Sequence, residues 1–345
     1  MEKKHIEWID ITKGLLITLV VLGHIISDNK NYVQMWIYSF HIPAFFIING
    51  ILKRNTCFLN KYNFRQVVRK QIKIWVTYVF FSILLMIRLY IQYKMNMYNI
   101  EEIKTYFLKF LLLNGIGVLW YLPTFELSEI IFYFYKKNNK NILYIVSLLI
   151  IMAIYFSNIE IFKNIEDINN IGVLLLILII RTFIASSYIY IGYYLAKIIE
   201  KKYFCFLGIF TSIFWINGNV DLNQLFFNNI IFYYVIAIAG TICIIAISKL
   251  IEKIKIETVK KILILWGKDS LLIMITHSIF LIIQITKLFF DKIIKNEHLI
   301  ICYSLVLTMF LETTLILIYR YLKKILKLCL VTKRERNMKS AECGK

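Results

Sequence analysis

Two histidines lie in strongly apolar stretches near the start of the chain. His24 ends an apolar run that begins at Trp8, and His41 opens a second one, HIPAFFIING. An imidazole titrates near neutral pH, so it can accept a proton and return it during a reaction. Ionisable groups are costly in an apolar medium, which makes each of these histidines a functional candidate. The first chemistry that the sequence suggests is therefore general acid–base catalysis inside an apolar protein.

Asp10 and Lys13 share one face of the expected first helix with His24. Lys13 and His24 fall within about 20° of each other around the axis and lie about 16 Å apart along it. Asp10 lies about one turn before Lys13 on the same stripe. A cation at one end and an imidazole at the other would suit an elongated anionic molecule. The simpler alternatives are that Lys13 extends to the membrane surface and that Asp10 caps the helix start.

The elements that must position these residues are membrane-spanning helices. Hydrophobic residues make up 59% of the chain, which has only 2 prolines. Apolar runs of roughly 18 to 25 residues, long enough to cross about 30 Å of hydrocarbon, recur along it. The sequence therefore predicts an all-α, polytopic bundle of about ten transmembrane helices, at residues 9–27, 33–52, 71–93, 117–135, 141–157, 174–197, 203–216, 229–248, 262–286 and 299–321.

The formal charge of +20 follows the expected topology. Most of the 41 lysines and arginines fall in alternate loops on one side of the predicted spans. This bias marks the cytoplasmic side and predicts that both termini are cytoplasmic. The basic charge thus needs no nucleic acid as a partner, whereas membrane lipids are an expected one.

The domain organisation follows from the same pattern. We expect one membrane domain over residues 1–322 and a basic cytoplasmic tail over 323–345, with no cleaved signal peptide. The 6 cysteines show no CxxC spacing, so we expect free thiols and no metal site. The abundance of Ile, Lys and Asn fits a multi-pass protein of a bacterial plasma membrane, while the oligomeric state stays open.

Further polar residues are expected at membrane depth. Counted along their helices, Glu126, Arg181 and His277 fall in the same outer layer as His24 and His41. The alternatives are structural: a lone histidine is often only a hydrogen-bond partner between helices, and Glu126 with Arg181 would make a buried ion pair. Their shared depth favours a site.

Two other groups of residues have equally plain alternatives. Arg65, Arg69 and Lys70 form a basic loop that could bind an anion or merely contact lipid headgroups. Trp120, in VLWYLPTF, would by default belong to an interfacial aromatic belt.

Four stretches, taken in order, resemble the integral membrane acyltransferases of the acyltransferase type-three family. They are WIDITKGLLITLVVLGH, SFHIPAFFIING, VLWYLPTFE and WGKDSLLIMITHSIF. The likeness covers most of the chain and is strongest over residues 8–50. The nearest branch resembles the fucose 4-O-acetylase-like and capsular polysaccharide O-acetyltransferases. In the family motif a basic residue, commonly arginine, precedes the first-helix histidine, and Lys13 and His24 occupy the matching positions.

The resemblance implies transfer of an acetyl group from cytoplasmic acetyl-CoA to a hydroxyl of an extracytoplasmic glycan. Our hypothesis for that reaction is that His24 is the general base and that Glu126, or another acid of the same layer, orients it. Lys13, Arg65, Arg69 and Lys70 bind the phosphates of CoA, a substrate and not a resident cofactor. The remaining candidates contact the acceptor or the developing oxyanion: Asp10, His41, Asn49, Trp120, Arg181 and His277. Asn49 stands where many relatives have serine, and Lys13 lacks the bidentate fork of arginine.

Two other functions compete with this one. A transporter or flippase for a glycan or small anion would use histidines and acids as a proton relay, and would favour discontinuous helices or an internal repeat. A non-catalytic component of a polysaccharide export machine would tolerate replacement of His24. Neither the acceptor sugar, nor acetyl as opposed to a longer acyl group, nor direct transfer as opposed to an acetyl-histidine intermediate can be derived from the residues.

Overall fold

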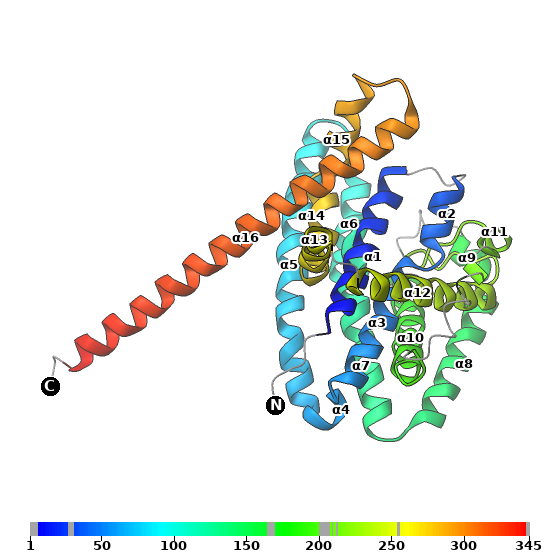
Figure 1. Cartoon of the computed structure of the whole chain (residues 1–345). Coiled ribbons are helices and arrows are strands. Elements are labelled where there is room, and N and C mark those ends of the chain that lie inside the picture. Colours follow the sequence, from blue (N-terminus) through cyan, green and yellow to red (C-terminus); the bar gives the residue numbers. More distant parts are fainter. Residues whose placement is uncertain are drawn as a thin grey trace. The chain divides into compact units, whose positions relative to one another are not determined.

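The computed structural model describes residues 6–26, 31–163, 170–199, 208, 210, 211, 213–253 and 256–342, with the backbone alone for 163, 216 and 326–342. Within these ranges the regular secondary structure is helical, apart from one isolated bridge between Asp221 and Phe226 (Figure 1). The all-α prediction is therefore confirmed. The long helices are α1 (Glu7–Ile26), α3 (His41–Asn55), α5 (Phe64–Lys94), α7 (Tyr121–Lys137), α8 (Asn141–Ser157), α10 (Ile171–Leu195), α12 (Ile230–Lys253) and α16 (Glu297–Glu342).

Shorter helices connect the long ones. They are α2 (Tyr32–Tyr38), α4 (Phe58–Lys61), α6 (Ile100–Leu111), η1 (Gly117–Trp120), α9 (Ile159–Lys163), α11 (Phe214–Asn217), α13 (Glu257–Lys268), α14 (Ser270–Ile279) and α15 (Ile282–Asp291).

Six helices of the described chain are long and apolar enough to cross a membrane, or seven if α13 and α14 form one broken span. The predicted span 141–157 coincides with α8, which is apolar but short. The predicted span 262–286 divides among α13, α14 and α15. Half of the predicted span 203–216 lies outside the described residues. A polytopic helical membrane protein is thus supported, while the number ten stays a prediction.

The chain forms two compact units, Met1–Lys268 and Asp269–Lys345. In the second unit α16 continues through residue 322 without a break, so the predicted boundary of the tail falls inside a helix. Thr276 Oγ1 donates to Glu312 Oε2 at 2.6 Å within this unit, which links α14 to α16. The candidates His24, His41, Glu126 and Arg181 all belong to the first unit.

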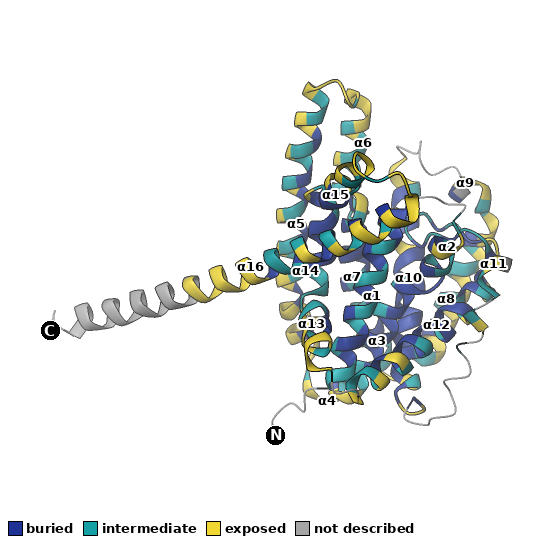
Figure 2. Cartoon of the chain, turned by 45° about the horizontal axis from the view of Figure 1, so that its top comes forward, coloured by how far each residue is buried: buried dark blue, intermediate teal, exposed yellow. Residues whose placement is uncertain are grey.

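Burial in the first unit is unequal. The membrane-length stretches of α1 and α10 are 67% and 61% buried, whereas that of α5 is 22% buried. Figure 2 shows buried residues concentrated in α1, α3 and α10 and exposed residues along α5. An apolar helix that leaves most of its surface uncovered is suited to face lipid. The inner helices therefore hold the site, and α5 belongs to the outer wall.

The inner helices approach closely where glycines meet carbonyl groups. A Cβ on Gly50 of α3 would clash with the carbonyl oxygen of Ile189, and one on Gly192 of α10 with that of Ile47. In α1 and α13, Gly14 and Gly267 make the same kind of contact with backbone carbonyls of the other helix. Small residues at such crossings allow backbones to pack directly against each other in a membrane.

The second predicted span is broken between α2 and α3. Phe40 takes a non-helical conformation there (φ −145°, ψ −20°), and Pro43 occupies the first turn of α3, where a missing N–H costs little. His41 Nδ1 donates to the carbonyl of Ile37 at 2.8 Å, one turn back across the break. The sequence FHIP therefore ends one helix and starts another.

Candidate active site

His24 lies near the end of α1 and faces Tyr38, the last residue of α2. The Tyr38 hydroxyl is 3.5 Å from Nδ1 of His24, at the outer limit of a hydrogen bond, and the two rings meet edge to face. Both side chains are half-buried. His24 thus contacts a hydroxyl group and keeps only part of its surface exposed.

Gly23 makes this approach possible. A Cβ at that position would lie 3.0 Å from Cε2 of Tyr38 and 3.4 Å from Cγ2 of Ile37. The carbonyl of Gly23 also faces the side-chain amide of Gln34, which donates to it at 3.4 Å. The glycine before His24 therefore lets α2 pack against the end of α1.

His41 joins the same cluster. Its ring centroid is 4.9 Å from that of Tyr38, and it interacts electrostatically with His24. The structure thus brings the two predicted histidines together, with Tyr38 in contact with both. Because the Nδ1–H of His41 is engaged with Ile37 across the helix break, part of its role is structural.

Lys13 and Asp10 pair with each other at the other end of α1. Lys13 Nζ lies 3.9 Å from Asp10 Oδ1, one helical turn away, and both side chains retain some exposure, 25% and 13%. Asp10 also lies in the first turn of α1, where an acid interacts favourably with the helix dipole. The predicted stripe of α1 therefore carries an ion pair at one end and His24 at the other.

Glu126 belongs to a different group, centred on Lys53 and Glu129. Lys53 Nζ is 2.8 Å from Glu129 Oε1, and Asn49 Nδ2 donates to the same oxygen at 2.7 Å. Glu126 interacts electrostatically with Glu129 and Lys53, while its two carboxylate oxygens have no hydrogen-bond partner among the described residues. It forms no ion pair with Arg181 there, and its carboxylate does not hydrogen-bond His24.

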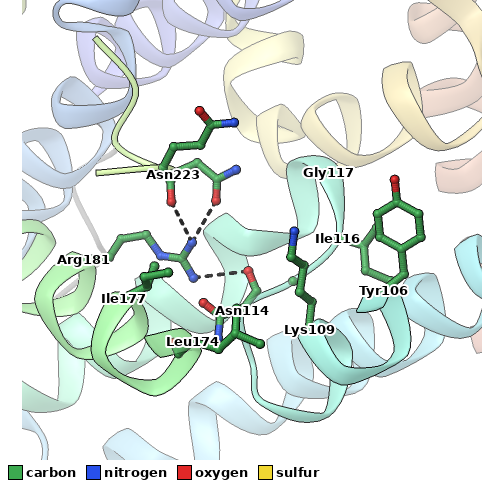
Figure 3. A pocket seen from close by; sticks show the side chains of 11 residues that line it. Tyr106, Lys109, Asn114, Ile116, Gly117, Leu174, Ile177, Arg181 and Asn223 are labelled. Atoms are coloured by element: carbon green, nitrogen blue, oxygen red, sulfur yellow. Dashed lines mark hydrogen bonds between the residues drawn. The ribbon is translucent and has the colours of Figure 1, made fainter. Parts of the chain in front are cut away.

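Arg181, on α10, lines a small cavity (Figure 3). Its Nη1 donates to Asn223 Oδ1 at 2.8 Å and its Nη2 to the carbonyl of Asn114 at 3.2 Å. The guanidinium carbon is 4.9 Å from the Trp120 ring centroid, a cation–π contact. These two predicted residues are therefore neighbours, and Trp120 is 8% exposed and not part of an open aromatic belt.

The basic residues Arg65, Arg69 and Lys70 are exposed on the first two turns of α5. Arg65 and Arg69 are four residues apart and thus share a helix face. Lys70 Nζ lies 3.1 Å above the ring of Tyr62. This surface can meet a phosphate group, because none of the three is enclosed.

His277 lies in the second unit. Its Nδ1 donates to the carbonyl of Ile273 at 2.8 Å, one turn back on α14, and the side chain is 1% exposed. This bond satisfies one ring nitrogen within its own helix, as expected for a structural histidine.

Sequence reasoning missed Tyr38 and Asp221. Tyr38 stands three residues before His41 in WIYSFHIP, a spacing that could have pointed to it. Asp221 interacts electrostatically with both Tyr38 and Arg181, from the loop that precedes α12. Desolvation raises its pKa, while backbone N–H groups of Asn223 and Gln224 and the charge of Arg181 act the other way.

No metal centre emerges from the described residues, which contain no cluster of three or more His, Cys, Asp or Glu side chains able to hold an ion. Cys57, Cys243 and Cys302, whose side chains the structure describes, form no disulfide.

The fold and the site define a polytopic helical membrane protein with an ionisable cluster among its inner helices. A family model described as an acyltransferase domain matches residues 6–318, nearly the whole chain. The chain belongs to the acyltransferase 3 family, and it is a membrane acyltransferase. Comparison with curated proteins and with solved structures returned no match.

Proposed function

We propose that this acyltransferase moves an acetyl group from cytoplasmic acetyl-CoA to a hydroxyl of an extracytoplasmic glycan, with His24 as general base. The observation that carries the proposal is the placement of His24 beside Tyr38, half-buried, on the α1 face that also carries Lys13. A titratable imidazole held by a hydroxyl, in a chain of this family, suits removal of a proton from an attacking alcohol.

The transfer step uses one proton acceptor and one leaving group. The sugar oxygen attacks the thioester carbonyl while His24 takes the hydroxyl proton through Nε2. The carbon–sulfur bond then breaks, CoA leaves as the thiolate, and the proton on His24 is returned to it. Tyr38 supports this step by accepting the Nδ1–H of His24, which keeps Nε2 as the base. General-base assistance of this kind contributes about 10² to 10⁴ in rate.

The donor would reach His24 along α1. Arg65, Arg69 and Lys70 are exposed and can bind the phosphates of CoA, and Lys13 lies at the near end of the stripe that leads to His24. The distance of about 16 Å along the helix between Lys13 and His24 suits an extended arm that carries the thioester.

This function is consistent with a topology of ten spans with both termini cytoplasmic, in a bacterial plasma membrane. The excess of Lys and Arg in alternate loops supports the orientation. The acceptor would then be a surface polysaccharide or its lipid-linked precursor, as in the fucose 4-O-acetylase-like branch that the sequence resembles.

The first experiment measures O-acetyl groups on the surface polysaccharide by NMR. Cells lacking the protein are complemented with wild type, with His24→Ala or with His298→Ala, at matched membrane abundance. His298 is the control because it is exposed at the start of α16. We expect acetyl signals with wild type and with His298→Ala, and none with His24→Ala.

The other outcomes discriminate between functions. If His24→Ala restored the acetyl signals, His24 would not be the general base. If the acetyl content were the same in all strains, including the strain lacking the protein, then acetyl transfer to this glycan would be wrong. Transport of an unmodified glycan would then be the leading alternative.

A further inference from the structure

A cavity of about 100 Å³ lies between α6, the turn that precedes η1, α10 and the loop before α12. Figure 3 shows Lys109 and Arg181 on opposite sides of it. Polar groups complete the wall, among them the side chains of Tyr106, Asn114, Asn223 and Gln224. The cavity therefore combines two cations with amide and hydroxyl groups.

Arg181 lines this cavity and has unused hydrogen-bonding capacity. The residue is 1% exposed, and its Nε has no hydrogen-bond partner among the described residues. Its two terminal nitrogens donate to neutral oxygens of Asn223 and Asn114. No carboxylate oxygen of the described residues lies within 4.0 Å of it, although Asp221 interacts with it at longer range. A buried guanidinium is normally paired with an anionic group, so Arg181 is available to bind an anion.

Lys109 supplies a second cation from a different helix. It lies in the last turn of α6 and is half-buried, and its side chain extends toward the cavity in Figure 3. Two cations from separate elements around one small space favour an oxyanion over a neutral group. The size agrees, because a cavity of about 150 Å³ holds benzene and a smaller one admits only a group of a few heavy atoms.

The cavity is also linked to the candidate active site. Asp221 lies in the loop that contributes Asn223 and Gln224 to the cavity wall, and its backbone bonds pair it with Phe226. The same Asp221 interacts electrostatically with Arg181 and with Tyr38, the neighbour of His24. Asp221 therefore lies within electrostatic range of both the cavity and the neighbour of His24.

We propose that the cavity between Lys109 and Arg181 binds an oxyanion of the acceptor, so that the acceptor is an acidic glycan. The oxyanion is either the carboxylate of a uronic acid or a phosphate on the sugar. This inference rests on the proposed function, because it takes the bound molecule to be the acceptor. The cavity is too small for a sugar ring, so the anion enters and the sugar stays outside, near His24.

The test measures binding to the full chain in lipid nanodiscs without acetyl-CoA. The probes are tritium-labelled tetragalacturonic acid, its carboxyl-reduced neutral counterpart, and glucose 1-phosphate with glucose as its neutral partner. The variants are Lys109→Gln and, as the matched control on the same helix, Lys104→Gln. Lys104 is exposed and pairs with Glu101 at 2.7 Å, away from the cavity wall.

We expect at least one charged probe to bind about 10-fold or more tightly than its neutral partner. Loss of a charge-assisted hydrogen bond should weaken that binding about 10-fold in Lys109→Gln and leave it unchanged in Lys104→Gln. Preference for tetragalacturonic acid would identify a uronic acid, and preference for glucose 1-phosphate a phosphorylated sugar. Equal binding of charged and neutral probes, or equal binding by the two variants, would overturn the proposal.

The binding test and the transfer test can give negative results independently of each other. Anion binding that depends on Lys109, together with unchanged glycan acetylation in the His24 experiment, would retain the anion site and reject acetyl transfer. Acetylation that depends on His24, with no preference for charged probes, would retain acetyl transfer and reject the anion site.

Discussion

The hydroxyl of Tyr38 lies 3.5 Å from Nδ1 of His24, and Tyr38 is also the ring neighbour of His41. In the proposed mechanism, a tyrosine from a short helix takes the place that a carboxylate commonly has in catalytic triads. The orientation of His24 would then depend on a group that remains neutral during the reaction.

Tyr38→Phe should lower kcat for acetyl transfer by about 10-fold, because it removes one hydrogen bond of about 1 to 1.5 kcal/mol. The KM for acetyl-CoA should change little, since Tyr38 is not among the residues proposed to bind the donor. Steady-state kinetics with labelled acetyl-CoA on purified protein would measure both. An unchanged kcat would show that Tyr38 does not orient His24.

Gly23→Ala should lower kcat at least as much as Tyr38→Phe does. The new Cβ would lie 3.0 Å from the Tyr38 ring, so that the ring has to move away from His24. If both changes act through the same contact, the double variant should lose little more than Gly23→Ala alone. Fully additive losses in this double-mutant cycle would contradict a common cause.

Gly192→Ala should destabilise the protein by about 1 to 3 kcal/mol or more, because its Cβ would clash with the carbonyl oxygen of Ile47. The measurement is the thermal unfolding midpoint in detergent. Gly172→Ala is the matched control on the same helix, since its Cβ would lie 3.2 Å from the flexible side chain of Asn170. Equal midpoints for the two variants would mean that α3 and α10 are not packed this closely.

Lys53→Met should cost about 3 to 5 kcal/mol of stability by leaving Glu129 as an unpaired charge. Lys53 is 4% exposed and lies 2.8 Å from that carboxylate. The double variant Lys53→Met with Glu129→Leu should recover most of the loss. Denaturation of the two single variants and the double variant would give the coupling energy, and a value near zero would argue against the pair.

Asp221 should make stability depend on pH. Desolvation raises its pKa above the ordinary value of 3.8, so the folded protein binds the proton more tightly than the unfolded chain does. The stabilisation is complete below 3.8 and is lost as the pH rises through the raised folded-state pKa. As the pH rises through that pKa, the thermal midpoint of wild type should therefore fall relative to that of Asp221→Asn. A constant difference would indicate no such shift in the pKa of Asp221.

The sequence predicted the features that depend on one helix at a time. The Lys13 and His24 stripe follows from helical periodicity, and the 3.9 Å contact of Lys13 with Asp10 is a local consequence of it. The all-helical fold likewise follows from the apolar runs, since backbone groups in lipid must be satisfied within each segment.

The sequence could not predict which distant helices meet. Depth along the helices places Glu126 and His24 in one layer, yet Glu126 interacts with Glu129 and Lys53. The depth of a residue gives its position along the membrane normal, but it does not give the side of the helix bundle on which the residue lies. The break between α2 and α3, which turns Tyr38 toward His24, likewise required the geometry of Phe40 and Pro43.

The glycine contacts of α3 with α10 and of α1 with α13 also bear on movement. At each crossing a backbone carbonyl occupies the space of a missing side chain, so sliding either pair by a turn would bring a larger residue against that carbonyl. The register of these helices is thereby locked. The inner helices then form a stationary frame. In the proposed mechanism the donor's flexible arm would cover the distance to His24, and the helices themselves would not carry it.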